Sequence, residues 1–115
     1  FYFYTIIWTL SKNREENKQF VREYNLNSAK QKGILLSLQV EEFCHSLQNK
    51  NKGYEHEVLY VFCAKRGLYY LDELKRSSVP IYLKFNILDS CLEEQERVVV
   101  ISFHKLNKPI EYFKP

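Results

Sequence analysis

Two apolar segments in the second half of the chain constrain its fold most strongly. Residues 81–87 have the sequence IYLKFNI, in which apolar residues alternate with more polar ones. Alternation with a period of two is typical of a strand that has one face on a core. Residues 58–64 have the sequence VLYVFCA and are apolar on both faces, which indicates a central strand covered on both sides. The pattern predicts an antiparallel sheet, and the first half of the chain must supply part of its cover.

The length and composition of the chain are those of one ordinary globular domain. The 115 residues are too few for two proper cores, so we expect a single domain over residues 1–115. The hydrophobic fraction of 45% and the charged fraction of 27% are typical of a folded chain rather than a disordered one. The formal net charge of +3 is too small to indicate nucleic-acid binding by itself.

The second half of the chain is expected to form a meander of four strands. Turn residues separate four short apolar segments, at 56–64, 68–71, 80–88 and 97–104. Lys65, Arg66 and Gly67 have the form of a three-residue hairpin loop, because glycine readily takes the left-handed conformation that ends such a loop. Pro80 opens the third strand, at a position that proline tolerates.

A short amphipathic helix is predicted over residues 14–24. Asn13 followed three residues later by Glu16 has the form of a capping box. Phe20 and Tyr24 then fall on one helical face. The helix is therefore expected to bury that face.

Residues 29–49 fit two patterns. The spacing of a buried helical stripe is followed by Leu36, Val40, Phe43, Cys44 and Leu47. As a strand, residues 34–41 alternate between apolar and polar side chains. Only a helix also accounts for residues 43, 44 and 47, so we predict one long helix over 29–49. A strand that begins at Gly33 is the alternative.

The N-terminal segment is compatible with two structures. Residues 1–10 are mostly apolar, and their β-branched and aromatic side chains divide between two strand faces. The segment is too short to cross a bilayer, which requires about twenty residues, but it also fits the end of a longer membrane helix cut away upstream of Phe1. We favour a strand, and we expect a membrane contact only through a segment missing upstream of Phe1.

The predicted architecture is α+β, with one long helix packed on a four- to five-stranded antiparallel meander. The N-terminal segment would supply the fifth strand. The order strand, helix, meander resembles cystatin-like and NTF2-like folds in outline. The resemblance is one of topology without a sequence motif, so it carries no implication for function.

No residue pattern indicates catalysis, a metal or a cofactor. The three cysteines, Cys44, Cys63 and Cys91, fit no disulfide framework or zinc motif. Cys44 and His45 would point about 100° apart on a helix, which disfavours joint metal binding. No glycine-rich phosphate loop is present in the sequence. We therefore expect no cofactor and no enzymatic activity, and the unpaired thiols favour an intracellular location.

An aromatic surplus favours binding to a protein partner or to a second copy of the chain. Aromatic residues make up 16% of the sequence, more than one helix–sheet interface is expected to accommodate. Tyrosine and tryptophan are favoured at interfaces because they combine apolar area with a polar tip, and an uncovered N-terminal strand would be a sticky edge. The predicted partner-binding residues are Tyr2, Tyr4, Trp8 and Tyr82. They indicate a non-enzymatic assembly domain, compatible with the soluble part of a larger or membrane-tethered subunit, although a tyrosine-rich core is an alternative account.

The alternative function is nucleic-acid binding through basic turns and an aromatic sheet face. Cations near the turns would contact phosphates while Tyr82 stacks on bases. The predicted contact residues are Lys65, Arg66, Lys75, Arg76 and Lys84. Basic residues gathered on one face would favour nucleic acid, and scattered ones would favour a protein partner.

Overall fold

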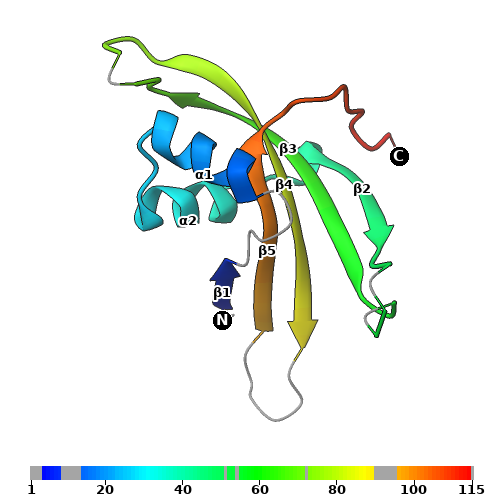
Figure 1. Ribbon diagram of the computed structural model, residues 1–115. Coiled ribbons are helices and arrows are strands. Elements are labelled where there is room, and N and C mark those ends of the chain that lie inside the picture. The colour runs from blue at the N-terminus through cyan, green and yellow to red at the C-terminus, as the bar shows by residue number, and fades with distance from the viewer. Residues whose placement is uncertain are drawn as a thin grey trace.

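The computed structural model shows an α+β fold, with two α-helices and a meander of four antiparallel strands (Figure 1). The structure describes residues 4–8, 14–50, 52–53, 55–71, 73–89 and 96–114.

The sheet contains five strands in the order β1-β5-β4-β3-β2. The strand bounds are β1 (Tyr4–Trp8), β2 (Phe43–Gln48), β3 (Val58–Leu68), β4 (Ser77–Asp89) and β5 (Glu96–Lys105). Strands β2 to β5 are antiparallel neighbours in chain order, whereas β1 pairs with β5 in parallel. The two edge strands are therefore β1 and β2.

Two helices precede the meander. They are α1 (Arg14–Glu23) and α2 (Ser28–Leu36), and a short 3-10 helix, η1 (Val40–Glu42), leads into β2. Asn27 caps α2, because its side-chain oxygen accepts a hydrogen bond from the Lys30 N–H at 2.9 Å. Figure 1 shows both helices on one side of the sheet, near one end of the long strands.

The register of β3 on β4 sorts side chains into two faces. Ala64 lies opposite Ile81, and both belong to the core that includes residues of α1 and α2. Val61 and Cys63 alternate with Ala64 and belong to a second buried cluster on the other side of the sheet. We call the first side the helix face and the second the tail face. Strand β3 is thus covered on both faces, which confirms the prediction from its unbroken apolar sequence.

Aromatic rings join α1 and β1 to the helix face. Phe103 on β5 is fully buried, and its ring centre lies 5.5 Å from that of Phe20 on α1 and 5.5 Å from that of Trp8 on β1. Tyr24 continues the cluster, with its ring centre 5.1 Å from that of Phe20. The apolar face predicted for residues 14–24 is therefore buried against the sheet.

A polar side chain of α1 completes the edge of β5. Strand β1 pairs only with the first half of β5, from Glu96 to Val100. Beyond that point the Phe103 N–H donates to the side-chain oxygen of Asn17 at 2.9 Å, and Asn17 is fully buried. A buried backbone N–H needs a partner, so Asn17 replaces the strand that β5 lacks there.

The C-terminal tail, residues 106–114, crosses the tail face. Leu106 and Ile110 pack on the cluster formed by Cys44, Val61 and Cys63. In Figure 1 the tail runs from the end of β5 towards the start of β2, away from the helices. The sheet is therefore covered by helices on one face and by an extended segment on the other.

The long helix predicted over residues 29–49 is not formed. Helix α2 ends at Leu36, where the Ser37 hydroxyl donates to the Ile34 carbonyl oxygen at 2.8 Å, and residues 43–48 form β2. Val40, a member of the expected buried stripe, is 79% exposed. The alternative strand from Gly33 is wrong as well, because residues 34–36 are helical. Pairing with β3 replaces the helical pattern from residue 43 onwards.

The hairpin predicted at residues 65–67 is also wrong. Strand β3 continues without a break to Leu68, and Gly67 lies opposite Ser78 of β4. The chain reverses between Leu68 and Ser77. Because β4 begins three residues before Pro80, it supplies ladder partners for residues 65–68, and these pairs replace the local turn.

The strand predicted over residues 68–71 is not formed either, because β3 ends at Leu68 and the fourth antiparallel strand is β2. The other elements agree with the sequence. Helix α1, β4 and β5 lie within a few residues of the predicted ranges, and residues 4–8 form a strand rather than the end of a helix. Asn13, the predicted cap of α1, lies outside the described residues. No helix in the described ranges is both long and apolar enough to cross a membrane. The resemblance to cystatin-like and NTF2-like folds stays a prediction.

Candidate functional site

The predicted partner-binding residues do not form one surface. Tyr2 lies outside the described residues, and the side chain of Tyr4 is not described. Trp8 is half-buried and packs on Phe103 of the helix face. Tyr82 is half-buried on the tail face. The sheet therefore separates Trp8 from Tyr82.

The predicted nucleic-acid residues are also divided. Lys65 and Lys84 belong to the tail face by strand alternation, and Lys84 is half-buried there. Arg66 points to the helix side, where its guanidinium bonds Glu42 at 2.6 and 2.9 Å. Two further cations, Lys75 and Arg76, are exposed in the connection between β3 and β4. Arg66 and Arg76 line one groove, but the five residues together form no continuous basic face.

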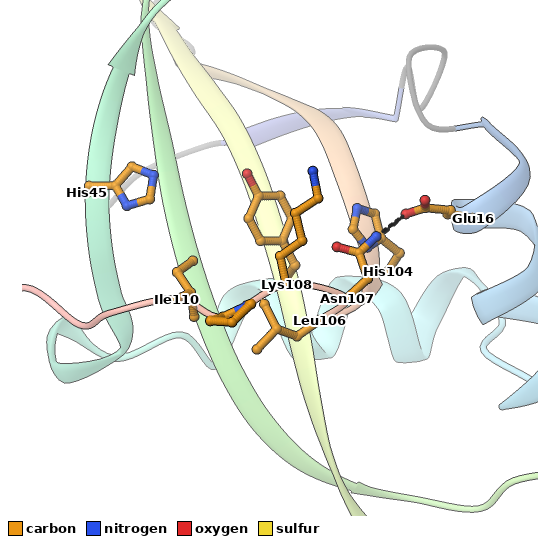
Figure 2. A pocket seen from close by; sticks show the side chains of 9 residues that line it. Glu16, His45, His104, Leu106, Asn107, Lys108 and Ile110 are labelled. Carbon is orange, nitrogen blue, oxygen red and sulfur yellow. Dashed lines mark hydrogen bonds and ion pairs between the residues drawn. The ribbon is translucent and has the colours of Figure 1, made fainter.

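A first candidate site is the tail-face pocket, a cavity of about 340 Å³ between the sheet and the start of the tail. Its walls come from β2, β4, β5, α1 and the tail. The lining residues are Glu16, His45, Tyr82, His104, Leu106, Asn107, Lys108, Pro109 and Ile110. Figure 2 shows His45 on one side of this pocket and the pair of Glu16 and His104 on the other.

His104 is the best-anchored polar side chain of the tail-face pocket. It is only 4% exposed, and its ring stacks on Tyr82 with a centre distance of 5.2 Å and an interplanar angle of 19°. Its Nδ1 lies 2.9 Å from the Lys105 carbonyl oxygen and 3.5 Å from the Glu16 carboxylate. The Asn107 amide donates to the same carboxylate at 2.8 Å. Glu16 therefore links α1 to both β5 and the tail.

The chemistry available in the tail-face pocket is limited. Among the described residues that line it, none is a serine, threonine or cysteine that His104 would activate as a nucleophile. Burial is the main cause that raises the pKa of Tyr82, and the nearby Cys44 is a smaller one. The Tyr82 hydroxyl therefore stays protonated. The contacts of Glu16 and His104 are those expected of side chains that fasten a helix and a tail to the sheet.

A second candidate site is the apolar groove on the helix face, a cavity of about 450 Å³. It lies between β1, α2, the segment that leads to η1, and the three central strands. The lining residues are Ile6, Leu35, Leu36, Leu38, Gln39, Val40, Phe62, Phe85 and Val98. Gln39 is the one polar residue of this lining.

Aromatic rings form the floor of the apolar groove. Phe62 stacks on Phe85 with a centre distance of 5.5 Å, and Phe43 and Tyr60 extend this row on either side, 5.4 Å from Phe62 and 6.2 Å from Phe85. At the rim, Leu36 is 57% exposed and Val40 is 79% exposed. Leu36 and Val40 both line the groove, and exposed apolar residues that lie together are a common feature of interaction sites.

An ion pair holds the rim of the apolar groove. The Arg66 guanidinium bonds both carboxylate oxygens of Glu42 and donates to the Ser37 carbonyl oxygen at 3.1 Å. The hydrogen bond from Arg66 holds the pKa of Glu42 below its usual value, against the opposing effect of burial. Residues 37–42 are thereby fixed on β3, and Val40 is kept at the rim.

A third candidate site, the basic groove, has a volume of about 480 Å³ between α2 and the β3–β4 connection. Three cations, Lys30, Arg66 and Arg76, line it together with Tyr24 and Tyr69. Gly33 and Gly67 also line the basic groove. A Cβ on Gly33 would meet no atom within 4 Å, so the groove is open above α2.

Sequence reasoning missed the contact of His104 with Glu16, the pairing of Glu42 with Arg66, and the contribution of α2 to the apolar groove and the basic groove. Glu16 and His104 are 88 positions apart, and Glu42 and Arg66 are 24 apart, so no local spacing relates them. Within the described ranges, no group of three or more His, Cys, Asp or Glu side chains is placed to hold a metal ion. No model of a known protein family matches the chain, and neither a curated protein nor a solved structure does.

Proposed function

We propose that this chain is a non-enzymatic assembly domain that binds a protein partner in the apolar groove. The observation that carries the proposal is the exposed apolar rim of Leu36 and Val40 beside a row of stacked aromatic rings. Burying such a rim under a partner yields about 25 cal/mol per Å² of apolar surface. Exposure of the same side chains to water contributes no comparable favourable free energy.

The chemistry of the groove favours an apolar segment of a protein, such as one face of an amphipathic helix. Its lining offers a single amide, Gln39, for polar recognition, whereas sites for polar small molecules place several polar groups around the ligand. Helices that dock in apolar grooves present side chains at a spacing of three to four residues. The Arg66–Glu42 pair prepares the rim before the partner arrives, which lowers the entropy cost of binding.

A photocrosslinking amino acid placed at position 40 tests this proposal in cells that express the chain. We expect a discrete crosslinked species from position 40, and its loss when Leu36→Asp puts a charge on the groove rim. Position 74 is the matched control, because Leu74 is 97% exposed but lies in the β3–β4 connection, away from the groove. Equal crosslinking from both positions, or a species that Leu36→Asp leaves unchanged, would contradict the proposal.

A second candidate function, nucleic-acid binding, is favoured by the basic groove. Lys30 and Arg76 have no carboxylate partner among the described residues and lie beside the tyrosines of the lining. Aromatic rings next to cations suit a single strand, because bases stack while phosphates are neutralised. Arg66 contributes less, since Glu42 already occupies its guanidinium.

Binding of a fluorescently labelled oligonucleotide tests this second candidate. We expect Lys30→Ala with Arg76→Ala to weaken binding and to flatten its dependence on salt, because fewer phosphates are then neutralised. Lys65→Ala is the control, as it removes one exposed cation from the other face of the sheet. An oligonucleotide that does not bind even at low salt would end this candidate function.

A further inference from the structure

The outer edge of β2 carries backbone groups that no described residue pairs with. The Asn49 N–H donates to the Glu57 carbonyl oxygen at 3.0 Å, which continues the register of β2 on β3. Inward- and outward-pointing groups alternate along an antiparallel strand. The N–H and C=O groups of Leu47 therefore face β3, and those of Ser46 and Gln48 face outward. No backbone hydrogen bond to these outward groups is found within the described ranges.

The same edge already accepts one hydrogen bond from an extended segment. The Phe113 N–H of the tail donates to the Phe43 carbonyl oxygen at 3.0 Å, and the two rings lie 5.8 Å apart. Among the described residues, this is the only backbone bond between the tail and β2. The edge thus has the geometry for an added strand, and no described segment of the chain pairs with residues 45–48 on that side.

The unpaired part of β2 lacks the features that usually prevent an edge strand from pairing with another chain. Residues 45–48 have the sequence HSLQ, with no Lys, Arg, Asp, Glu or Pro, and all four side chains are exposed. Natural edge strands are usually protected by lysine, proline, inward-facing charge or a covering segment. A neutral edge also permits a second copy of itself to approach without repulsion between like charges.

The charges that flank β2 favour an antiparallel second copy. Glu41 precedes the strand and Lys50 follows it, and both are exposed. Antiparallel pairing centred near Ser46 places the Glu41 end of one copy at the Lys50 end of the other, whereas parallel pairing would bring like charges together. Two other carboxylates nearby are already engaged, since Glu42 bonds β3 and Glu55 accepts the N–H of Gly53 at 3.0 Å.

We propose that two copies of this chain associate through their β2 edges, antiparallel and around a two-fold axis, so that the sheet continues across the dimer. The contact is self-complementary, because the outward N–H and C=O groups of one copy meet the same groups of the other. The occupant of this edge is therefore a second copy of the chain. It uses a surface distinct from the apolar groove, so that either proposal can fail without the other.

Ser46→Pro tests the dimer by removing an outward N–H. We expect sedimentation velocity of the unmodified chain to give twice the mass of one chain, with a fraction that rises with concentration, and Ser46→Pro to give one chain mass. An edge strand tolerates proline where the N–H faces solvent, so Ser46→Pro should keep the circular dichroism of the unmodified chain. Leu47→Pro is the matched control, because it removes an inward N–H and should destabilise the fold.

Hydrogen exchange of the unmodified protein provides a test without any substitution. The amides of Ser46 and Gln48 should exchange quickly in dilute protein and become protected as concentration rises. The Leu47 amide should be protected at every concentration, because its bond lies within one copy. Fast exchange of the Ser46 and Gln48 amides at concentrations where the chain is dimeric would place the contact elsewhere and overturn the proposal.

Charge reversal tests the orientation of the two strands. Glu41→Lys alone and Lys50→Glu alone should each weaken the dimer by about fivefold at low salt, as expected for exposed pairs. The double variant Glu41→Lys with Lys50→Glu should restore the affinity. A chain that stays monomeric at all concentrations, or one that grows into open polymers, overturns the proposal.

Discussion

The guanidinium of Arg66 on β3 donates to both carboxylate oxygens of Glu42 in η1, at 2.6 and 2.9 Å. The bidentate contact ties the segment after α2 to the central strands, and both side chains are mostly covered, with exposed fractions of 24% and 17%. It holds the position of Val40 at the rim of the apolar groove. The proposed partner binding and the stability of the fold would therefore both depend on this pair.

Glu42→Gln should lower the free energy of unfolding by about 1–3 kcal/mol near neutral pH, because it leaves a charged, partly buried Arg66 without its partner. Chemical denaturation followed by circular dichroism measures the change. Glu41→Gln is the control, as Glu41 is exposed and should change stability by less than about 0.5 kcal/mol. Equal losses in the two variants would show that the bidentate contact adds nothing.

The contribution of the Glu42–Arg66 pair should depend on pH in a defined direction. The pKa of Glu42 is lowered from its usual 4.5, mainly by the hydrogen bond from Arg66. The pair therefore contributes fully above pH 4.5 and its contribution is lost as pH falls through the lowered pKa of the folded state. The stability difference between the unmodified chain and Glu42→Gln should shrink in this acidic range. A difference that is constant with pH would exclude the ion pair as its source.

Asn17→Ala should destabilise the fold by about 1–3 kcal/mol, because the buried Phe103 N–H loses its acceptor. The Phe103 amide should also exchange faster with solvent, which hydrogen exchange measures residue by residue. Asn107→Ala removes an exposed hydrogen bond to Glu16 and should cost less than about 0.5 kcal/mol. Unchanged protection of the Phe103 amide in Asn17→Ala would mean that another group covers this edge of β5.

Gly33→Ala should raise the free energy of unfolding by about 0.5–1 kcal/mol, because alanine stabilises a helix interior relative to glycine. A Cβ at this position meets no atom within 4 Å, so no steric cost opposes the gain. Gly53→Ala is the contrasting variant, since Gly53 has φ of 92° and a side chain there should cost about 1–2 kcal/mol. Thermal unfolding of the two variants should therefore shift in opposite directions.

The thiols of Cys44 and Cys63 should resist modification while the tail is docked. Both side chains are buried, and burial raises the pKa of the Cys44 thiol, which further lowers its reactivity. In a Cys91→Ser background, Ile110→Asp should detach the tail and accelerate thiol labelling. Labelling at an unchanged rate would show that the tail does not control access to the tail face.

Tyr112 reports on the same docked tail. Burial and the neighbouring Cys63 raise its pKa to about 12, although the residue as a whole is 39% exposed. We expect Ile110→Asp, which should detach the tail, to remove the tyrosine titration step near pH 12. Thiol labelling should become faster in the same variant.

Elements with local causes are predictable from the sequence. The alternation in residues 81–87 and the apolar composition of residues 58–64 recur as β4 and β3, and the amphipathic pattern of residues 14–24 recurs as α1. In each case neighbouring residues carry the signal, because burial of one face or two depends on a short periodic pattern. The two faces of β3 and of most of β4 therefore follow from the sequence, whereas at the end of β4 Ile87 is 45% exposed and Asn86 is buried.

The structure of residues 37–48 could not be predicted from local sequence patterns. Their apolar spacing fits a helix better than a strand, yet the segment leaves α2 and pairs with β3 from Phe43 onwards. The ladder with β3 and the bonds from Arg66 to Glu42 stabilise the extended form, and both partners lie far along the chain. The sites follow the same rule, since the sequence around Arg66 predicts a phosphate contact and does not indicate its bond to Glu42.

The order of residues along the chain is enough to establish an α+β fold, its central strands and the apolar side of its first helix. Those properties follow from short-range periodicity and from the need to remove apolar side chains from water. Other properties depend on the folded chain. They are the end of α2, the identity of the edge strand β2, the parallel pairing of β1 and the contact between Glu16 and His104. In these cases backbone groups and charged side chains bond to segments that lie far away in the sequence and come close only on folding. The local sequence pattern around a residue therefore does not predict its partner.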